Sequence, residues 1–167
     1  MARLAGTGEM AGVLLTEDAV SAAPDGMKQL SEKFEPIADI LGQLVTEYRA
    51  GRATCHGEVL HLYLLGVSDR VARRGVGQQL VAWCIENGAR RGYRVAVAEA
   101  TNKVSQHIFH KLGFIPRAER SYRDYLFHGH PVFQAVAEAG GPVLMEKSLV
   151  PLLPTASGFQ GGGRSRG

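Results

Sequence analysis

The sequence predicts one domain of the α+β class, with helices packed on a central sheet. Residues 58–67 and 94–100 are short and almost continuously apolar, which is typical of buried strands. A helical pattern follows each of these strands, so crossovers long enough to join parallel neighbours are expected. The chain has 167 residues and is 45% hydrophobic, which suffices for a single core.

The first part of the chain predicts a strand, a turn and a helical region. Residues 8–16 have the composition of a strand, and Pro24–Gly26 is typical of a turn. Apolar side chains recur at helical spacing over residues 27–48. Because Pro36 lies inside this pattern, we expect a short helix, a break, and a second helix that starts near Glu35.

The strand over residues 58–67 is the clearest in the chain. His61 is almost its only polar residue, so we expect it in the sheet interior with both faces covered. The helix that follows should end before Gly92. Its inward face is predicted to contain Leu80, Val81, Cys84 and Ile85.

A second strand and a second helix continue the pattern. Residues 94–100 predict a central strand, Asn102 is a typical helix cap, and Gly113 a typical helix end. Residues 114–122 and 142–149 predict later strands. The inward face of the second helix is predicted to contain Val104, Ser105, Ile108, Phe109 and Leu112.

A glycine-rich basic turn, Arg73–Gly77, joins the first buried strand to its helix. Peptide N–H groups converge at such a helix start, the helix dipole adds positive charge, and glycine permits close approach, so we expect a phosphate ligand. The P-loop does not fit, because no Gly-Lys-Ser/Thr follows. The dinucleotide fingerprint lacks its third glycine and its acidic residue.

Composition argues against several other classes. The net charge of +3 is too weak and diffuse for nucleic acid, and no apolar run approaches the roughly 18 residues of a membrane span. Cys55 and Cys84 form neither a disulfide nor a zinc pattern, so we expect a reducing, cytoplasmic setting and no metal. Residues 151–167 are rich in Pro, Gly and Ser and predict a disordered tail after a domain over 1–150.

Three segments together resemble the GNAT acyltransferase superfamily, and within it the arylalkylamine N-acetyltransferases of the insect and microbial type. They are LHLYLLGVSDRVARRGVGQQL, TNKVSQHIFHKLGF and SYRDYLFHGHPVF. The resemblance covers about residues 58–150. It implies a mixed, largely antiparallel sheet between helices on both faces, and transfer of acetyl from acetyl-CoA to a small primary amine.

The resemblance also implies a cofactor site. Its residues would be Leu65, Gly66 and Val67, pairing with the pantetheine arm; Ala72, Arg73, Arg74, Gly75, Val76 and Gly77 around the pyrophosphate; and Asn102, Ser105 and Phe109 near the pantetheine. Ala72 departs from the Arg or Gln of the family motif, and Arg70, Arg73 and Arg74 are the candidates to supply the charge.

Two residues are candidates for proton transfer by the same resemblance. The family's usual acid is a tyrosine at the position of Phe109, which cannot donate a proton, and Ser105 one turn earlier is the substitute. Ser105 is equally compatible with simple packing. His61 matches the first histidine of a catalytic His-x-His pair, although a single histidine on an apolar strand is more often a core residue.

The front of the chain looks shorter than that of the family. Residues 8–15 match only the second strand of a hairpin, so the first strand, the first helices and one hairpin strand are expected to be missing. The alternative is a compact variant in which residues 27–50 take the place of the early helices. This leaves three hypotheses: an amine N-acetyltransferase, a peptide or protein N-acetyltransferase, and a catalytically impaired module that binds CoA or a partner. The sequence predicts no oligomeric state.

Overall fold

The computed structural model describes residues 1–21 and 32–149. Six strands and three α-helices make up the described chain, with three short 3₁₀ turns between them. In order they are β1 (Ala2–Arg3), β2 (Met10–Asp18), η2 (Glu32–Phe34), α1 (Glu35–Arg49), β3 (Val59–Val67), η3 (Asp69–Val71), α2 (Val76–Arg90), β4 (Val95–Ala100), α3 (Lys103–Lys111), β5 (Ile115–Glu119), η4 (Gln134–Ala139) and β6 (Val143–Ser148).

The strands form one sheet in the order β1-β2-β3-β4-β6-β5. β3 and β4 are parallel, and every other pair of neighbours is antiparallel. The parallel pair is the one joined through a helix, α2, because a parallel connection must return across the sheet. The expected mixed, largely antiparallel sheet is confirmed.

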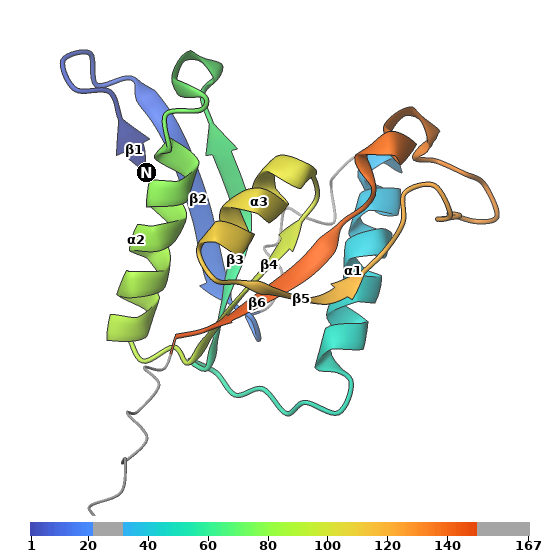
Figure 1. The fold of residues 1–167 in the computed structure, drawn as a ribbon. Helices are drawn as coiled ribbons and strands as arrows, with labels where there is room; N and C mark the ends of the chain where they lie inside the picture. Colours follow the sequence, from blue (N-terminus) through green and yellow to red (C-terminus); the bar gives the residue numbers. More distant parts are fainter. Residues whose placement is uncertain (22–31, 150–167) are drawn as a thin grey trace, which may run out of the picture.

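Helices cover both faces of this sheet (Figure 1). On one face α2 contacts β2 and β3, and α3 contacts β4 and β6; on the other, α1 contacts β5 and β6. Successive side chains of a strand point to opposite faces of the sheet. In β6, Met145 packs into the core under α2 and α3, whereas Leu144 packs against Leu44 of α1. The α+β class is therefore confirmed.

β3 and β4 pair over three residues only, from Val59 with Val95 to His61 with Val97. Beyond them lies what we term the β3–β4 split, the halves 62–67 of β3 and 98–100 of β4. Opposite this part of β3, the register with β2 skips Tyr63, a β-bulge that bends the strand. Tyr63 and Leu64 are 42% and 46% exposed, so the prediction that both faces of this strand are covered was wrong for its second half.

Local signals predicted the helix ends well. α1 begins at Glu35 with Pro36 in its first turn, where the missing N–H of proline is harmless. Asn102 caps α3, and Gly113 follows it with φ +82°. Val104 was wrongly assigned to the inward face: it lies one turn before Ile108, but in the first turn of α3 it is 71% exposed.

The front of the chain differs from the expectation of a missing hairpin strand. β1 pairs antiparallel with β2, matching Ala2 with Gly12 and Arg3 with Met10. The predicted turn at 24–26, the short helix before residue 32 and the tail lie outside the described residues. None of the described helices combines the length and hydropathy that crossing a membrane requires.

Candidate functional site

The glycine-rich turn presents unoccupied amides at the start of α2. Among the described residues, no oxygen accepts from the N–H groups of residues 75–78; the first amide with an acceptor is that of Gln79, bonded to the Gly75 carbonyl at 2.9 Å. The first amides of a helix lack partners within the helix, and here no side chain caps them. The turn can therefore receive an anion through its main chain.

Two glycines shape this turn for different reasons. Gly75 has φ +77°, which is costly for other residues, and a Cβ there would meet open space. Gly77 is buried, and a Cβ would lie 3.3 Å from Ile108 and 3.4 Å from Val67. Gly75 therefore supplies backbone conformation, and Gly77 allows α2 to pack closely on β3 and α3.

The arginines of this region are not equivalent. Arg70 forms an ion pair of 2.8 Å with Glu9. Arg73 and Arg74 are exposed and have no side-chain partner among the described residues, and Arg73 adopts φ +62°. The positive charge available to a ligand is therefore that of Arg73 and Arg74. Ala72 and Val76 lie in the same turn, as predicted.

The β3–β4 split is open at the end beside this turn. The β3 residues predicted to meet the pantetheine arm, Leu65–Val67, pair with β2 on one side and have no described strand on the other. The N-terminus of α3, with Asn102, follows the end of β4. The predicted residues of the turn, the split and the α3 cap are thus brought to one end of the sheet.

Ser105 and Asn102 form a reciprocal capping box. The Asn102 side chain accepts from the Ser105 amide at 2.9 Å, and the Ser105 hydroxyl donates to the Asn102 carbonyl at 2.9 Å. Phe109 is buried and packs edge-on against Phe114, with ring centroids 5.0 Å apart. Ser105 therefore has a structural role as a capping residue, and Phe109 one in the core.

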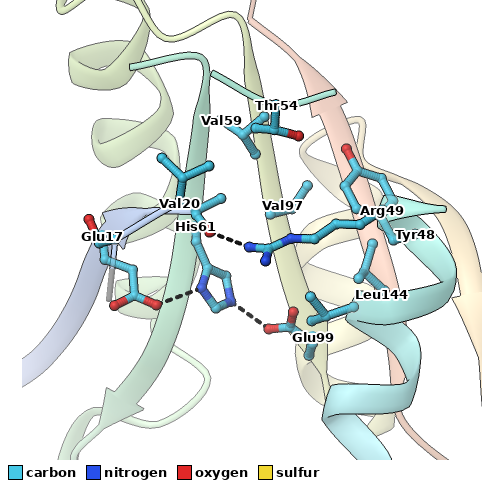
Figure 2. Close-up of a pocket in the computed structure, with 13 residues that line it drawn as sticks. Glu17, Val20, Tyr48, Arg49, Thr54, Val59, His61, Val97, Glu99 and Leu144 are labelled. Atoms are coloured by element: carbon cyan, nitrogen blue, oxygen red, sulfur yellow. Dashed lines mark hydrogen bonds and ion pairs between the residues drawn. The ribbon is translucent and has the colours of Figure 1, made fainter. Parts of the chain in front are cut away.

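His61 lies between two carboxylates on neighbouring strands (Figure 2). Its Nδ1 is 2.9 Å from Glu17 of β2, and its Nε2 is 2.6 Å from Glu99 of β4. Burial by itself lowers the pKa of His61, but the hydrogen bonds and charges of Glu99 and Glu17 outweigh it and raise the pKa above its ordinary value. Both ring nitrogens face acceptors, so the imidazolium is the favoured form.

These three residues line a pocket of about 200 Å³ on the α1 face of the sheet. Tyr48 and Arg49 of α1 line it as well, and the Arg49 guanidinium donates to the Ala19 carbonyl rather than to a carboxylate (Figure 2). The pocket thus lies where β3 and β4 part, on the face opposite α2 and α3.

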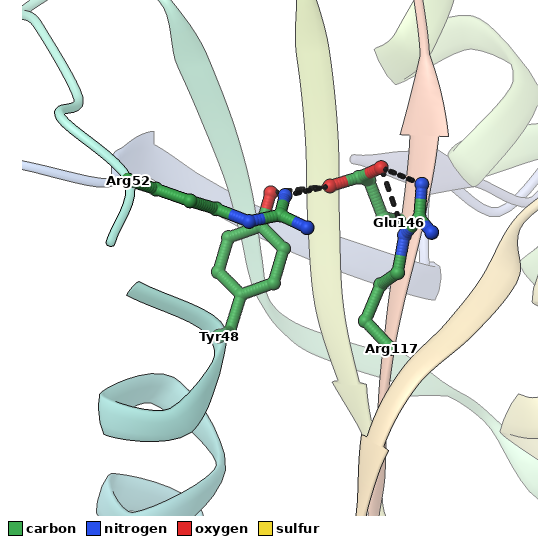
Figure 3. Close-up of polar contacts among 4 residues, drawn as sticks. All are labelled: Tyr48, Arg52, Arg117 and Glu146. Atoms are coloured by element: carbon green, nitrogen blue, oxygen red, sulfur yellow. Dashed lines mark hydrogen bonds and ion pairs between the residues drawn. The ribbon is translucent and has the colours of Figure 1, made fainter. Parts of the chain in front are cut away.

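Glu146 of β6 holds the C-terminal end of α1 against the sheet (Figure 3). It accepts hydrogen bonds from the Tyr48 hydroxyl at 2.6 Å, from Arg52 at 2.8 Å and from Arg117 at 2.6 Å. Although burial acts to raise the pKa of Glu146, these donors outweigh it and lower the pKa. Burial and the Glu146 hydrogen bond raise the pKa of Tyr48 to about 12, so its hydroxyl stays protonated.

A second pocket, of about 430 Å³, is mainly apolar. Tyr122 and Phe133 line it, with ring centroids 5.1 Å apart, and Asn102 lies at its edge. The Tyr122 hydroxyl donates to the Thr101 carbonyl at 2.9 Å, so its ring is fixed next to the end of β4. Two aromatic residues of SYRDYLFHGHPVF, Tyr122 and Phe133, thus form part of the wall of this pocket.

Sequence reasoning missed Glu17 and Glu99. Each lies in a strand of otherwise ordinary composition, and only the cross-strand register brings them to His61: Glu17 is directly opposite His61, and Glu99 is two residues beyond its partner Val97. The sequence carried a signal for Glu99 alone, a charged residue on a strand predicted to be buried, which is costly without a partner. Glu17 lies one residue beyond the predicted strand over 8–16, because β2 continues to Asp18.

Comparisons with known proteins agree with this geometry. A protein-family profile described as FR47-like protein matches residues 46–123. Arylalkylamine N-acetyltransferase 2 from Aedes aegypti superposes with a TM-score of 0.72 at 22% identity, over 88% of this chain and 71% of that one. The chain has the GNAT fold. The GNAT-like fold that the resemblance implied is therefore confirmed.

Two further solved structures have a fold similar to that of this chain. The C-terminal condensation domain of Ebony, solved with beta-alanyl-dopamine, gives a TM-score of 0.76 at 12% identity, over 85% of this chain and 68% of that one. The putative acetyltransferase yncA from Salmonella typhimurium, solved with acetyl-CoA, gives a TM-score of 0.51 at 18% identity, over 89% of this chain and 64% of that one. A search of curated protein sequences finds no match.

Proposed function

We propose that this GNAT-fold chain is an acetyl-CoA-dependent N-acetyltransferase of small primary amines, with arylalkylamines as the acceptor class. The observation that carries the proposal is the row of unoccupied amides at residues 75–78, beside two exposed arginines and at the mouth of the β3–β4 split. A helix start of this kind suits a diphosphate. The solved GNAT structure with acetyl-CoA supports that cosubstrate.

In this proposal the main chain holds most of the cosubstrate. Residues 73–77 bind the pyrophosphate through N–H groups and the Arg73 and Arg74 guanidinium groups. The free edge of β3 at Leu65–Val67 pairs with the pantetheine arm as a neighbouring strand would. A peptide N–H of that edge also stabilises the oxyanion that forms when the amine attacks the thioester carbonyl.

The acceptor occupies the α1 face. The pocket beside Glu17, His61 and Glu99 is next to the origin of the split, and one oxygen of each carboxylate has no partner among the described residues. An acceptor reaches the site mainly as an ammonium ion, since primary amines have pKa values near 10, and these carboxylates attract it. The aromatic pocket beside Asn102 favours an aryl group on that amine.

The departing thiolate needs little help, because a thiol pKa near 8.5 makes it a good leaving group. The predicted acid, Ser105, already donates its proton to the Asn102 carbonyl. We therefore favour the packing and capping interpretation for Ser105, and propose that the thiolate leaves without a dedicated side-chain acid.

A peptide or protein acceptor is the second candidate. Leu15, Tyr63 and Leu64 leave an apolar strip of β2 and β3 exposed on the acceptor face, which would accommodate an extended chain. The third hypothesis, a module that binds CoA without turnover, keeps the same cofactor site and lacks only the reaction.

Two measurements separate these functions. Calorimetric titration with acetyl-CoA should show saturable binding. Its absence would exclude both acetyltransferase functions and leave only a module that binds a partner. Detection of released thiol with a panel of tryptamine, tyramine, dopamine and short peptides then identifies the acceptor. Turnover with the arylalkylamines supports the proposal, turnover with peptides alone supports the second candidate, and binding without turnover supports the third.

A further inference from the structure

The contact between His61 and Glu99 crosses the sheet where backbone pairing stops. His61 and Val97 are the last paired residues of β3 and β4, and Glu99 is the next residue of β4 on the same face. The 2.6 Å contact therefore ties the two strands together at the origin of the split. The 2.9 Å contact with Glu17 extends this tie to β2.

Burial separates the roles of the two carboxylates. The Glu99 side chain is 9% exposed and that of Glu17 is 30% exposed, while that of His61 is 15% exposed. A buried carboxylate left without a donor is costly, so Glu99 requires the imidazolium. Neither ring nitrogen of His61 remains free to take a proton from an acceptor.

We propose that His61 is a positioning residue, held as an imidazolium between Glu17 and Glu99, that fixes the origin of the β3–β4 split and both carboxylates of the acceptor pocket. The inference rests on the proposed function and assigns His61 a role other than that of the catalytic base. It also assigns Glu17 and Glu99 to the site.

The surroundings of His61 agree with this assignment. The Tyr63 ring meets the imidazole edge-on, with centroids 5.8 Å apart. From α1, Arg49 and Tyr48 line the same pocket, but their donors are directed to the Ala19 carbonyl and to Glu146. Within the described residues, Glu17 and Glu99 are the carboxylates that meet the charge of His61.

The first test reads the protonation state of His61 directly and needs no turnover. Nitrogen-15 NMR of the full chain should show both ring nitrogens protonated at pH 7.5, with a titration midpoint above the ordinary value of about 6.5. Glu99→Gln and Glu17→Gln should each lower that midpoint. The control Glu9→Gln, which removes an exposed partner of Arg70, should leave it unchanged. A neutral imidazole at pH 7.5 would overturn the proposal even if acetyl transfer is found.

The second test compares two replacements of His61 in the turnover assay. His61→Lys keeps a positive charge between the carboxylates but is not a base at neutral pH, whereas His61→Gln removes the charge. A positioning role predicts a fall in kcat of about tenfold for the glutamine variant and of less than threefold for the lysine variant. Equal loss in both variants is the outcome of a base and would refute the proposal.

Separate controls distinguish a loss of folding from a failure of the proposed function. Far-UV circular dichroism checks that both variants fold, and Glu99→Gln repeats the kinetic test if His61→Gln does not. If the wild-type chain proves inactive with every acceptor, the proposed function fails, while the NMR result still decides the charge and partners of His61.

Discussion

The two faces of the sheet are built in different ways, although the same strands supply both. Under α2 and α3, the residues of β3 and β4 are apolar and buried, such as Leu60, Leu62, Ala96 and Ala98. On the α1 face, the alternate residues of the same strands include His61 and Glu99. One face is a packed core beside a main-chain anion site, and the other is a polar pocket made by side chains.

This difference explains what a sequence motif can reveal. The proposed cofactor site depends on peptide groups, and glycines mark where a ligand must approach those groups closely. The acceptor side depends on side chains that come from three strands, which no local pattern brings together. The comparison therefore predicts that changes in backbone conformation weaken binding at the proposed cofactor turn. Changes in side-chain charge should instead impair the proposed acceptor pocket.

The largest expected effect is on the cofactor side. Gly75→Val forces a β-branched residue into φ +77°, a strain of about 1–3 kcal/mol that the turn will relieve by rearranging. Acetyl-CoA affinity should fall about 10–100-fold by calorimetric titration. The control is Gly92→Val at the other end of α2, which has φ +94° and the same open surroundings. Equal losses in both variants would show that strain in the helix, and not the turn, matters.

On the acceptor side, Glu146→Gln should have the largest effect on stability. The amide cannot satisfy Arg52 and Arg117 as the carboxylate does. Because Glu146 is largely buried but both arginines are partly exposed, the change should cost about 2 kcal/mol in the free energy of unfolding. Urea denaturation measures the change. The matched control, Glu138→Gln, disrupts an exposed pair with Arg123 and should cost less than about 0.5 kcal/mol. Similar values would mean that Glu146 does not anchor α1.

The charge of His61 predicts a pH dependence with a definite sign. Because its pKa is raised in the folded chain, protonation stabilises the fold, and the gain is fully present below the unfolded value of about 6.5 while the carboxylates stay ionised. It disappears as the pH rises through the folded pKa. The wild type should exceed His61→Gln by about 2 kcal/mol near pH 6, and by less at alkaline pH, in urea denaturation. A gap that widens with pH would contradict the imidazolium.

The smallest expected effects distinguish the arginines of the turn. Arg73→Ala and Arg74→Ala should each weaken acetyl-CoA binding about 2–5-fold, with a loss that shrinks at high salt. Arg70→Ala serves as the control, since its guanidinium is already paired with Glu9. A larger loss for Arg70 than for the other two would place the diphosphate elsewhere.

Much of the fold followed from the sequence because its signals are local. Pro36 marked the start of α1, Asn102 capped α3, and Gly113 ended that helix. Local signals failed where the outcome depends on distant residues. The exposure of Tyr63 and Leu64 depends on how much of β3 the helix α1 covers, and the strand composition carries no information on that.

The candidate site likewise has a part that local sequence predicted and a part that depends on distant residues. The turn at 73–77 was predicted, and the roles assigned to its residues stay predictions. The partners of His61 were not predicted, because a shift of one residue in the register of β2 would turn Glu17 to the opposite face. The hydroxyl contact of Ser105 was likewise inaccessible, since the pattern Asn-x-x-Ser fits both a capping box and a free side chain.

The short pairing of β3 with β4 has a thermodynamic consequence. Beyond His61, no strand among the described residues pairs with the inner edge of β3, so a bound molecule that hydrogen-bonds to these peptide groups serves as part of the sheet itself. Such a molecule then stabilises the native state by an amount that, well above its dissociation constant, rises with the logarithm of its concentration. The melting temperature of this protein should therefore rise with the concentration of the proposed cosubstrate.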